Sequence, residues 1–185
     1  MLGKTRMKTA LLVAATGCLA ISSTASAGSY LGLALGTDPG VDSDFEQAVG
    51  QPSGRSLRGL VGVRFGNVSL EGALNGFDVV THGLGDHTAY QLSGALKLSL
   101  PLGNNFEGFA RVGLERTWLN LGGNGFDLMG DGFLVGGGFE YRLDAVLTNA
   151  SIFVDYNVHR ATLSSDRFHV DATMRIWGLG FSVGI

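Results

Sequence analysis

The sequence contains little cysteine and little proline. Its single cysteine, Cys18, lies within the first 27 residues, so the remainder of the chain can form no disulfide. Proline occurs three times, whereas glycine occurs 30 times. Abundant glycine without low-complexity segments argues against disorder and favours strands with closely approaching backbones. The chain must therefore be stabilised by strand pairing and side-chain packing.

Long apolar runs and an excess of positive charge are also missing. No stretch after residue 27 reaches the 18 apolar residues expected of a transmembrane helix. If the chain enters a membrane, it must do so as strands. Residues 28–185 contain ten basic and 16 acidic residues, a net charge of −6. This balance excludes the basic surface that nucleic-acid-binding proteins carry.

The first 27 residues are typical of a secretory signal peptide. Three basic residues precede an apolar run, and Ala-Ser-Ala at 25–27 provides a small-residue cleavage site. The apolar run is too short to be a membrane anchor. Cys18 lacks the preceding leucine that a lipidation motif requires. The sequence predicts a signal peptide at 1–27 and one domain at 28–185.

Eight segments of the mature chain alternate between apolar residues and polar or small residues with a period of two. Long and short connections alternate between them, as in an up-and-down barrel with short turns at one end and long loops at the other. The predicted fold is therefore all-β, an eight-stranded antiparallel up-and-down transmembrane β-barrel. The predicted strands are 29–36, 57–65, 68–77, 90–100, 106–117, 132–143, 148–159 and 173–185, the last beginning as early as 169. The predicted short turns are 66–67, 101–105 and 144–146, and the predicted long loops are 37–55, 78–87, 118–130 and 160–168.

The last predicted strand has one large apolar face and one nearly bare face. Trp177, Leu179 and Phe181 alternate with Gly178 and Gly180. Large residues facing lipid and small residues facing a crowded lumen would produce this pattern. Since a membrane does not tolerate an unpaired strand edge, we expect this strand to pair with the first.

The polar faces of the predicted strands carry five positive and five negative charges. Eight strands enclose an interior just wide enough for side chains, and buried charges are stable only when matched. Arg111 and Glu115 are four residues apart, so both would face the lumen at successive levels. Structural ion pairs that close the lumen are one interpretation, and a gate over a narrow ion path is the alternative. The candidate ion-pair residues are Arg58, Arg64, Glu71, Lys97, Arg111, Glu115, Glu140 and Asp155.

Aromatic residues are expected to form a girdle at each membrane interface. Those nearer the short turns are Tyr30, Phe65, Phe106, Tyr141 and Phe181. Those nearer the long loops or the strand middles are Tyr90, Trp118, Tyr156 and Trp177.

The leader, the four hairpins and the terminal segment GLGFSVGI together resemble the small eight-stranded outer-membrane barrels of the OmpA-like and OmpX-like type. Within that segment Gly178, Phe181 and Val183 match the signal read by the barrel-assembly machinery, whereas Ile185 stands where such proteins often have Phe. The resemblance implies fold and location, the outer membrane of a Gram-negative bacterium reached by export, more than activity. It also implies outer-membrane lipid, lipopolysaccharide and the barrel-assembly machinery as partners of a monomer.

Some barrels of this size modify lipid A, and the last predicted loop and its flanks contain potential catalytic side chains. The His-x-Ser-Asn motif of the barrel deacylases is absent, because Arg160 and Ala161 follow His159. The polar residues of this region are His159, Ser164, Ser165, Asp166 and His169.

Two further groups could suggest a metal, but neither has a complete ligand pattern. They are Asp42, Asp44 and Glu46 in the first loop, and His82, Asp86 and His87 in the second. We expect no metal and no cofactor. The resulting hypothesis is an integral outer-membrane barrel of structural or surface-interaction type without catalysis. The alternatives are a lipid A- or phospholipid-modifying barrel enzyme, a narrow ion-conducting barrel and a soluble ligand-carrying barrel.

Overall fold

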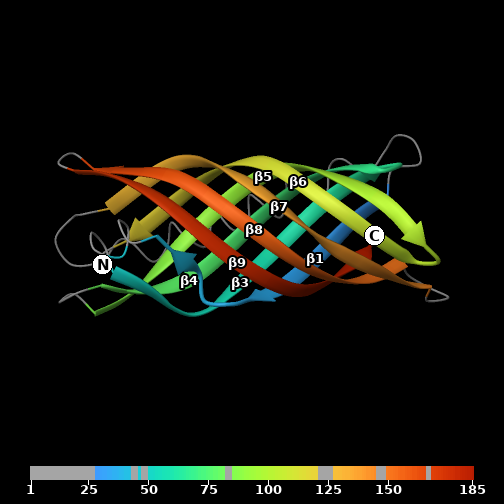
Figure 1. The fold of residues 1–185 in the computed structure, drawn as a ribbon, viewed down its shortest axis with the longest axis horizontal. Coiled ribbons are helices and arrows are strands. Elements are labelled where there is room, and N and C mark those ends of the chain that lie inside the picture. The colour runs from blue at the N-terminus through green and yellow to red at the C-terminus, as the bar shows by residue number, and fades with distance from the viewer. Residues whose placement is uncertain are drawn as a thin grey trace.

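Antiparallel strands wind into a closed barrel in the computed structural model (Figure 1). The structure describes residues 28–42, 46, 50–81, 85–120, 127–144, 149–165 and 168–185. The predicted signal peptide lies outside these residues. The described part of the chain contains no helix long and apolar enough to cross a membrane. The strands are β1 (Gly28–Gly36), β2 (Gly40–Val41), β3 (Gly50–Phe65), β4 (Val68–Thr81), β5 (Gly85–Gly103), β6 (Phe106–Asn120), β7 (Asp127–Asp144), β8 (Asn149–Ser165) and β9 (Phe168–Gly184).

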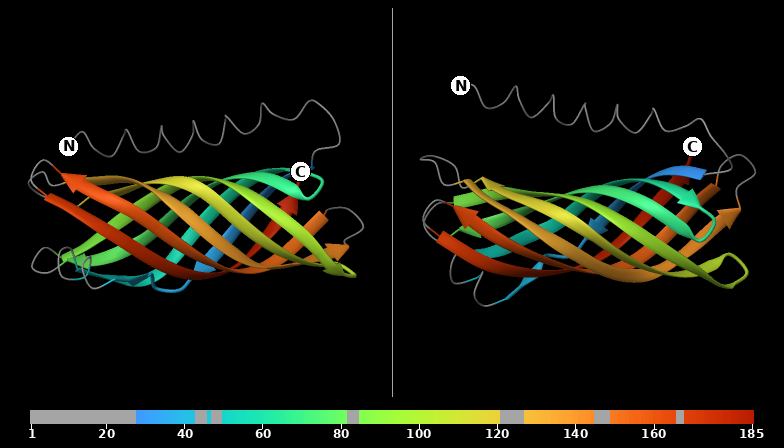
Figure 2. Two further views of the ribbon diagram at one scale, coloured as in Figure 1. Left: turned by 45° about the horizontal axis from the view of Figure 1, so that its top comes forward. Right: turned by 90° about the horizontal axis from the view of Figure 1, so that it is seen from above.

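Eight of these strands form the barrel, because each neighbour in the order β1-β3-β4-β5-β6-β7-β8-β9 pairs antiparallel and β1 also pairs with β9. The predicted fold class and the predicted pairing of the first and last strands are confirmed. Following paired residues from Leu35 around the barrel leads to His169 of β9, whereas Leu35 itself pairs with Leu179. This offset of ten residues is the stagger that closes the barrel, and it accompanies the strand tilt visible in Figure 2.

The two faces of the strands are sorted in the opposite way to a soluble protein. Large apolar side chains face outward and form an apolar band around the barrel; Leu33, Leu96, Leu114 and Leu179, for example, are between 52% and 76% exposed. Within the height of this band, charged and polar side chains face the lumen, and most of them are buried. An apolar exterior with a polar interior is the arrangement of a transmembrane barrel.

The strands continue far into the segments predicted as long loops, so the predicted boundaries at this end are wrong. β4 ends at Thr81 and β5 begins at Gly85, while β6 ends at Asn120 and β7 begins at Asp127. Apolar and polar residues still alternate in these extensions, but the apolar residues now face the lumen and the polar residues face outward. Polar residues such as Asp78 face outward there, while Phe77 and Val79 face the lumen and are almost fully buried. The outward apolar pattern stops before the strand does, so strand ends predicted from that pattern come too early.

The first long connection contains an extra strand that was predicted as loop. Gly40 and Val41 of β2 pair with Arg175 and Met174 of β9, beyond the point where β1 stops at Gly36. β2 thus continues the pairing of β9 toward the long-loop end. The turn at 66–67 is as predicted, and the turn predicted at 101–105 is tighter, since β5 continues to Gly103 before turning at 104–105.

Candidate functional site

The centre of the lumen contains a continuous chain of ion pairs. The Asp155 carboxylate lies 2.5 Å from Arg58 Nη2 and 3.2 Å from Arg111 Nη1. Arg111 Nε lies 3.4 Å from Glu71 Oε2, and Lys97 Nζ lies 3.6 Å from Glu71 Oε1 and 2.6 Å from Glu140 Oε2. Three cations and three carboxylates therefore alternate without net charge. We call this chain the ionic layer; its members are Arg58, Asp155, Arg111, Glu71, Lys97 and Glu140.

Each of the six consecutive strands β3 to β8 contributes one member of the ionic layer. Each side chain is at least nine-tenths buried, so the desolvation of every charge has to be offset by its partners. The ring of Phe109 also lies 4.4 Å from Lys97 Nζ and 4.9 Å from the guanidinium of Arg111. An aromatic face near two cations adds an attraction that no acidic residue supplies.

The remaining two barrel strands make room for the ionic layer. On β9, a Cβ added at Gly178 would lie 2.5 Å from Asp155 Oδ1 and 3.4 Å from Arg58 Nη2. One added at Gly180 would overlap the ring of Phe153. The expectation that the bare face of the last strand accommodates bulky or charged lumen residues is confirmed.

On β1, Tyr30 is not part of the outward aromatic girdle that was predicted to include it. Leu31, Leu33 and Leu35 occupy the outward face of this strand, so the alternation turns Tyr30 into the lumen. Its hydroxyl donates a hydrogen bond to Glu71 Oε1 at 2.6 Å. The ring fits because the facing residue is Gly62, where any side chain would overlap it.

A second buried pair lies between the ionic layer and the long-loop end. His159 Nδ1 is 2.5 Å from Glu115 Oε2, and Gln91 Nε2 donates to Glu115 Oε1 at 3.1 Å. Glu115 was predicted to join the same network as Arg111, but four residues along a strand span about 13 Å. The partner nearest in space is His159, a residue that had been considered only as a potential catalytic side chain.

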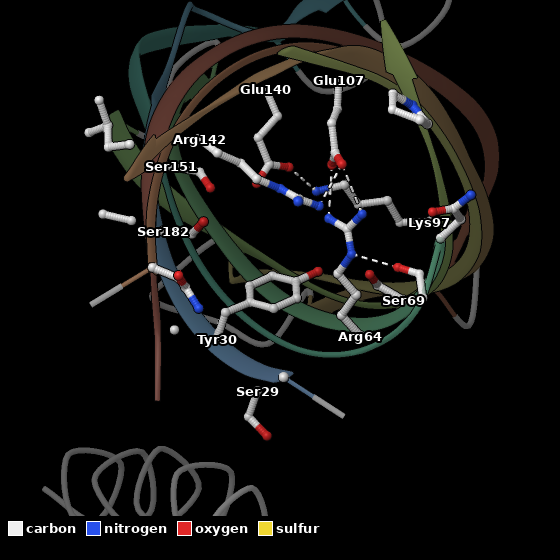
Figure 3. A pocket seen from close by; sticks show the side chains of 18 residues that line it. Ser29, Tyr30, Arg64, Ser69, Lys97, Glu107, Glu140, Arg142, Ser151 and Ser182 are labelled. Atoms are coloured by element: carbon white, nitrogen blue, oxygen red, sulfur yellow. Dashed lines mark hydrogen bonds and ion pairs between the residues drawn. The ribbon is translucent and has the colours of Figure 1, made fainter. Parts of the chain in front are cut away.

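The short-turn end of the lumen opens into a cavity of about 620 Å³ (Figure 3). Arg64 and Glu107 form a bidentate pair across it, with distances of 2.8 and 3.0 Å. Arg142 Nη2 also lies 2.5 Å from Glu107 Oε1. Glu107 and Arg142 were not among the predicted ion-pair residues, although their positions on the predicted polar faces carried the signal. Lys97 and Glu140 connect this cavity to the ionic layer.

Apolar side chains gather inside the lumen toward the long-loop end. Between this group and the ionic layer, two further cavities measure about 10 Å³ each, which is about the space of one water molecule. The described part of the lumen therefore changes from an open polar cavity to packed apolar side chains. We call this group the apolar cap; it consists of Phe77, Val79, Ala89, Leu119, Leu163, Ala172 and Met174.

His159 and Ser164 are the potential catalytic residues whose side chains are described, and they do not come together. His159 faces the lumen and is 4% exposed, whereas Ser164 lies an odd number of residues away and projects to the opposite face of β8. Among the described residues no group of three or more His, Cys, Asp or Glu side chains is placed to hold a metal. The other candidates lie outside the described residues or have undescribed side chains; they are Asp44, His82, Asp86, His87, Ser165, Asp166 and His169.

Comparison with known proteins places this architecture among outer-membrane barrels. The chain matches the family model described as outer membrane protein beta-barrel domain over residues 9–184. Neisserial surface protein A shares the fold with a TM-score of 0.64 at 16% identity, over 87% of this chain and 100% of that chain. Ail of Yersinia pestis, in complex with the heparin analogue sucrose octasulfate, has a TM-score of 0.54 at 14% identity, over 86% of this chain and 97% of that chain. No curated protein sequence matches the chain.

Proposed function

Because the chain belongs to the outer membrane protein beta-barrel domain family, it is an outer-membrane barrel, and we propose that it is of structural or surface-interaction type. Its lumen is closed by ion pairs, and it catalyses no reaction. The short-turn end faces the periplasm and the long-loop end faces the exterior, as the topology of such barrels implies. The signal peptide at 1–27 directs its export.

The observation that supports this proposal best is the way the lumen is filled. The apolar band supplies the lipid-facing surface, while the ionic layer and the apolar cap occupy the interior in series. A barrel whose interior is packed with paired charges and apolar side chains offers a rigid scaffold for external loops rather than a diffusion pore. Loops on a rigid scaffold are common sites of binding.

Membrane fractionation combined with gel mobility tests the proposal. We expect the protein to fractionate with outer membranes and to migrate as a folded species in cold detergent, with its mobility changing on boiling. A soluble periplasmic product would contradict the membrane assignment and favour the ligand-carrying alternative. Release of labelled acyl groups from lipopolysaccharide by the folded barrel would contradict the absence of catalysis.

Narrow ion conduction is the second candidate function, and the geometry of Lys97 and Arg111 favours it specifically. Each of these cations lies near two carboxylates, so either could exchange one partner for the other. The cavity at the short-turn end already reaches Lys97. Planar-bilayer recording of the wild-type barrel distinguishes the two functions. A closed scaffold should give no unitary current, whereas a conducting barrel should give discrete openings.

A further inference from the structure

The outward-facing positive charges of the barrel lie at one end. Among the described side chains, four arginines face outward and are exposed, whereas the other four described arginines and Lys97 line the lumen or its mouth. On its strand, each of these four is the first outward-facing residue beyond the apolar band on the long-loop side. They are Arg55 on β3, Arg116 on β6, Arg160 on β8 and Arg175 on β9.

Three of these arginines lie at nearly the same height although their strands are tilted. The offset of ten residues is spread over eight strands. Residues at equal height along the barrel axis are therefore displaced by about one residue per strand from the residues that pair with each other. Applied from Arg116 across β7, this rule reaches Arg160 and then Arg175 to within about one residue. They therefore form part of a ring at the edge of the apolar band, where the apolar residues of the strands change from the outward face to the lumen face.

Arg160 and Arg175 are the members of this ring that form no ion pair with another described side chain. Arg160 pairs with Thr173 and Arg175 with Val158, so the two arginines are diagonal neighbours on β8 and β9, about 7–8 Å apart at the backbone. No ion pair among the described side chains includes either of them. Asp171 lies diagonally opposite Arg160 but accepts a hydrogen bond from Thr162, and neither arginine is within ion-pair distance of it. Both guanidinium groups therefore have donors available for an anion from outside the protein.

Arg116, by contrast, is satisfied within the protein. Its Nε and Nη2 atoms donate to the two carboxylate oxygens of Asp131 at 2.5 and 2.7 Å. The same ring thus contains one arginine in an ion pair and two neighbouring arginines that form no ion pair with a described side chain.

The residues below the pair place it at a membrane interface. Tyr156 and Trp177 are the next outward residues on the periplasmic side of Val158 and Arg175, and their rings lie 4.8 Å apart. Aromatic pairs of this kind lie at headgroup level in membrane proteins. At the opposite edge of the band the outward residues include Phe65, Phe106 and Tyr141, with no outward-facing arginine or lysine among the described side chains.

We propose that Arg160 and Arg175 bind a phosphate group of the phosphorylated glycolipid in the outer leaflet, the lipid A part of lipopolysaccharide. The guanidinium groups provide planar, paired donors that match phosphate oxygens. Tyr156 and Trp177 contact the sugar and upper acyl region beside them. The proposal rests on the proposed outer-membrane function, because only a barrel in that membrane meets this lipid.

Native mass spectrometry of the folded protein in mild detergent tests the proposal, with bisphosphorylated lipid A and its dephosphorylated form of equal acyl composition as probes. We expect the double variant Arg160→Ala/Arg175→Ala to bind bisphosphorylated lipid A about 30-fold more weakly. That figure follows from about 1 kcal/mol for each arginine near an anionic surface, roughly fivefold each. The dephosphorylated lipid should bind wild type and double variant equally.

Two further variants make the outcome decisive. Arg116→Ala removes the same side chain from the same ring and should change binding less than threefold, because Asp131 already occupies its guanidinium. Arg160→Lys/Arg175→Lys retains both charges but loses the paired donors, so its affinity should lie between those of wild type and the alanine variant. This variant also keeps the test valid if the alanine variant folds poorly. The assignment is overturned if wild type and the double alanine variant bind bisphosphorylated lipid A equally. It is also overturned if Arg116→Ala loses as much affinity as the double alanine variant. Failure of the wild type to fold as a heat-modifiable barrel would instead refute the proposed function.

Discussion

At the scale of single residues, Asp155 is the most demanding member of the ionic layer. Its side chain is fully buried and it contacts both Arg58 and Arg111. Asp155→Ala would leave two buried guanidinium groups without this shared carboxylate. Removing one partner of a buried pair typically costs about 3–5 kcal/mol, so we expect the free energy of unfolding in lipid vesicles, measured with urea, to fall by about that amount.

The exposed pair of Arg116 and Asp131 provides the matched control for this prediction. Both side chains are more than half exposed, and exposed ion pairs contribute little to stability. Asp131→Ala should leave the unfolding midpoint unchanged. A midpoint for Asp155→Ala equal to that of the wild type would show that the arginines find other partners, and the ionic layer would lose its structural role.

Gly178 carries a second prediction at this scale, because its missing side chain is what lets Arg58 reach Asp155. Gly178→Ala would place a methyl group 2.5 Å from Asp155 Oδ1. Overpacking of this kind costs about 1–3 kcal/mol, again measured as a loss in the free energy of unfolding. Gly94→Ala is the control, since nothing lies within 4 Å of the added carbon. Equal effects of the two substitutions would contradict the packing argument.

At the scale of the strand, each long hairpin has two halves with opposite patterns. In the membrane half the apolar residues face outward, and in the half beyond it they face the lumen. On β8, for example, Val154 faces outward while Leu163 is 1% exposed inside the apolar cap. On β3, β6, β8 and β9 an outward arginine marks the point of change, so the reversal locates the membrane edge on these strands.

The reversal also explains what could be predicted from the sequence and what could not. Eight strands, their order and the closure of β1 on β9 follow from local alternation and from the length of the connections. Strand ends at the long-loop side do not, because a chain that changes phase has no continuous outward apolar pattern. The residues of the ionic layer could be predicted as a set from alternation. Their partners could not, since Lys97 and Glu140 are 43 residues apart and meet only across the lumen.

Leu163 allows the inward half of the hairpins to be tested. Leu163→Ala removes a fully buried side chain from the apolar cap, and such substitutions cost about 2–5 kcal/mol. We expect a corresponding loss in the free energy of unfolding. Its neighbour Ser164 projects to the other face, so Ser164→Ala should change stability by less than about 0.5 kcal/mol. A negligible effect at Leu163 would mean that the cap is not packed as a core.

At the scale of the whole molecule, the proposed closed scaffold has two barriers to ions in series. The ionic layer lies in the middle of the lumen, and the apolar cap lies toward the long-loop end. Barriers in series block a path as long as either one remains. The removal of Arg111 alone should therefore leave the barrel closed, and so should the removal of a cap residue alone.

The combined variant Arg111→Ala/Phe77→Ala opens both barriers and should conduct. Arg111 contacts two carboxylates of the ionic layer, and Phe77 is a buried aromatic member of the cap, so the two truncations widen the lumen on either side of the buried pair of Glu115 and His159. Planar-bilayer recording should show unitary currents in the double variant and none in wild type or either single variant. If Arg111→Ala alone conducts as well as the double variant, the cap does not seal the lumen. Currents already present in the wild type would favour the ion-conducting function over the closed scaffold.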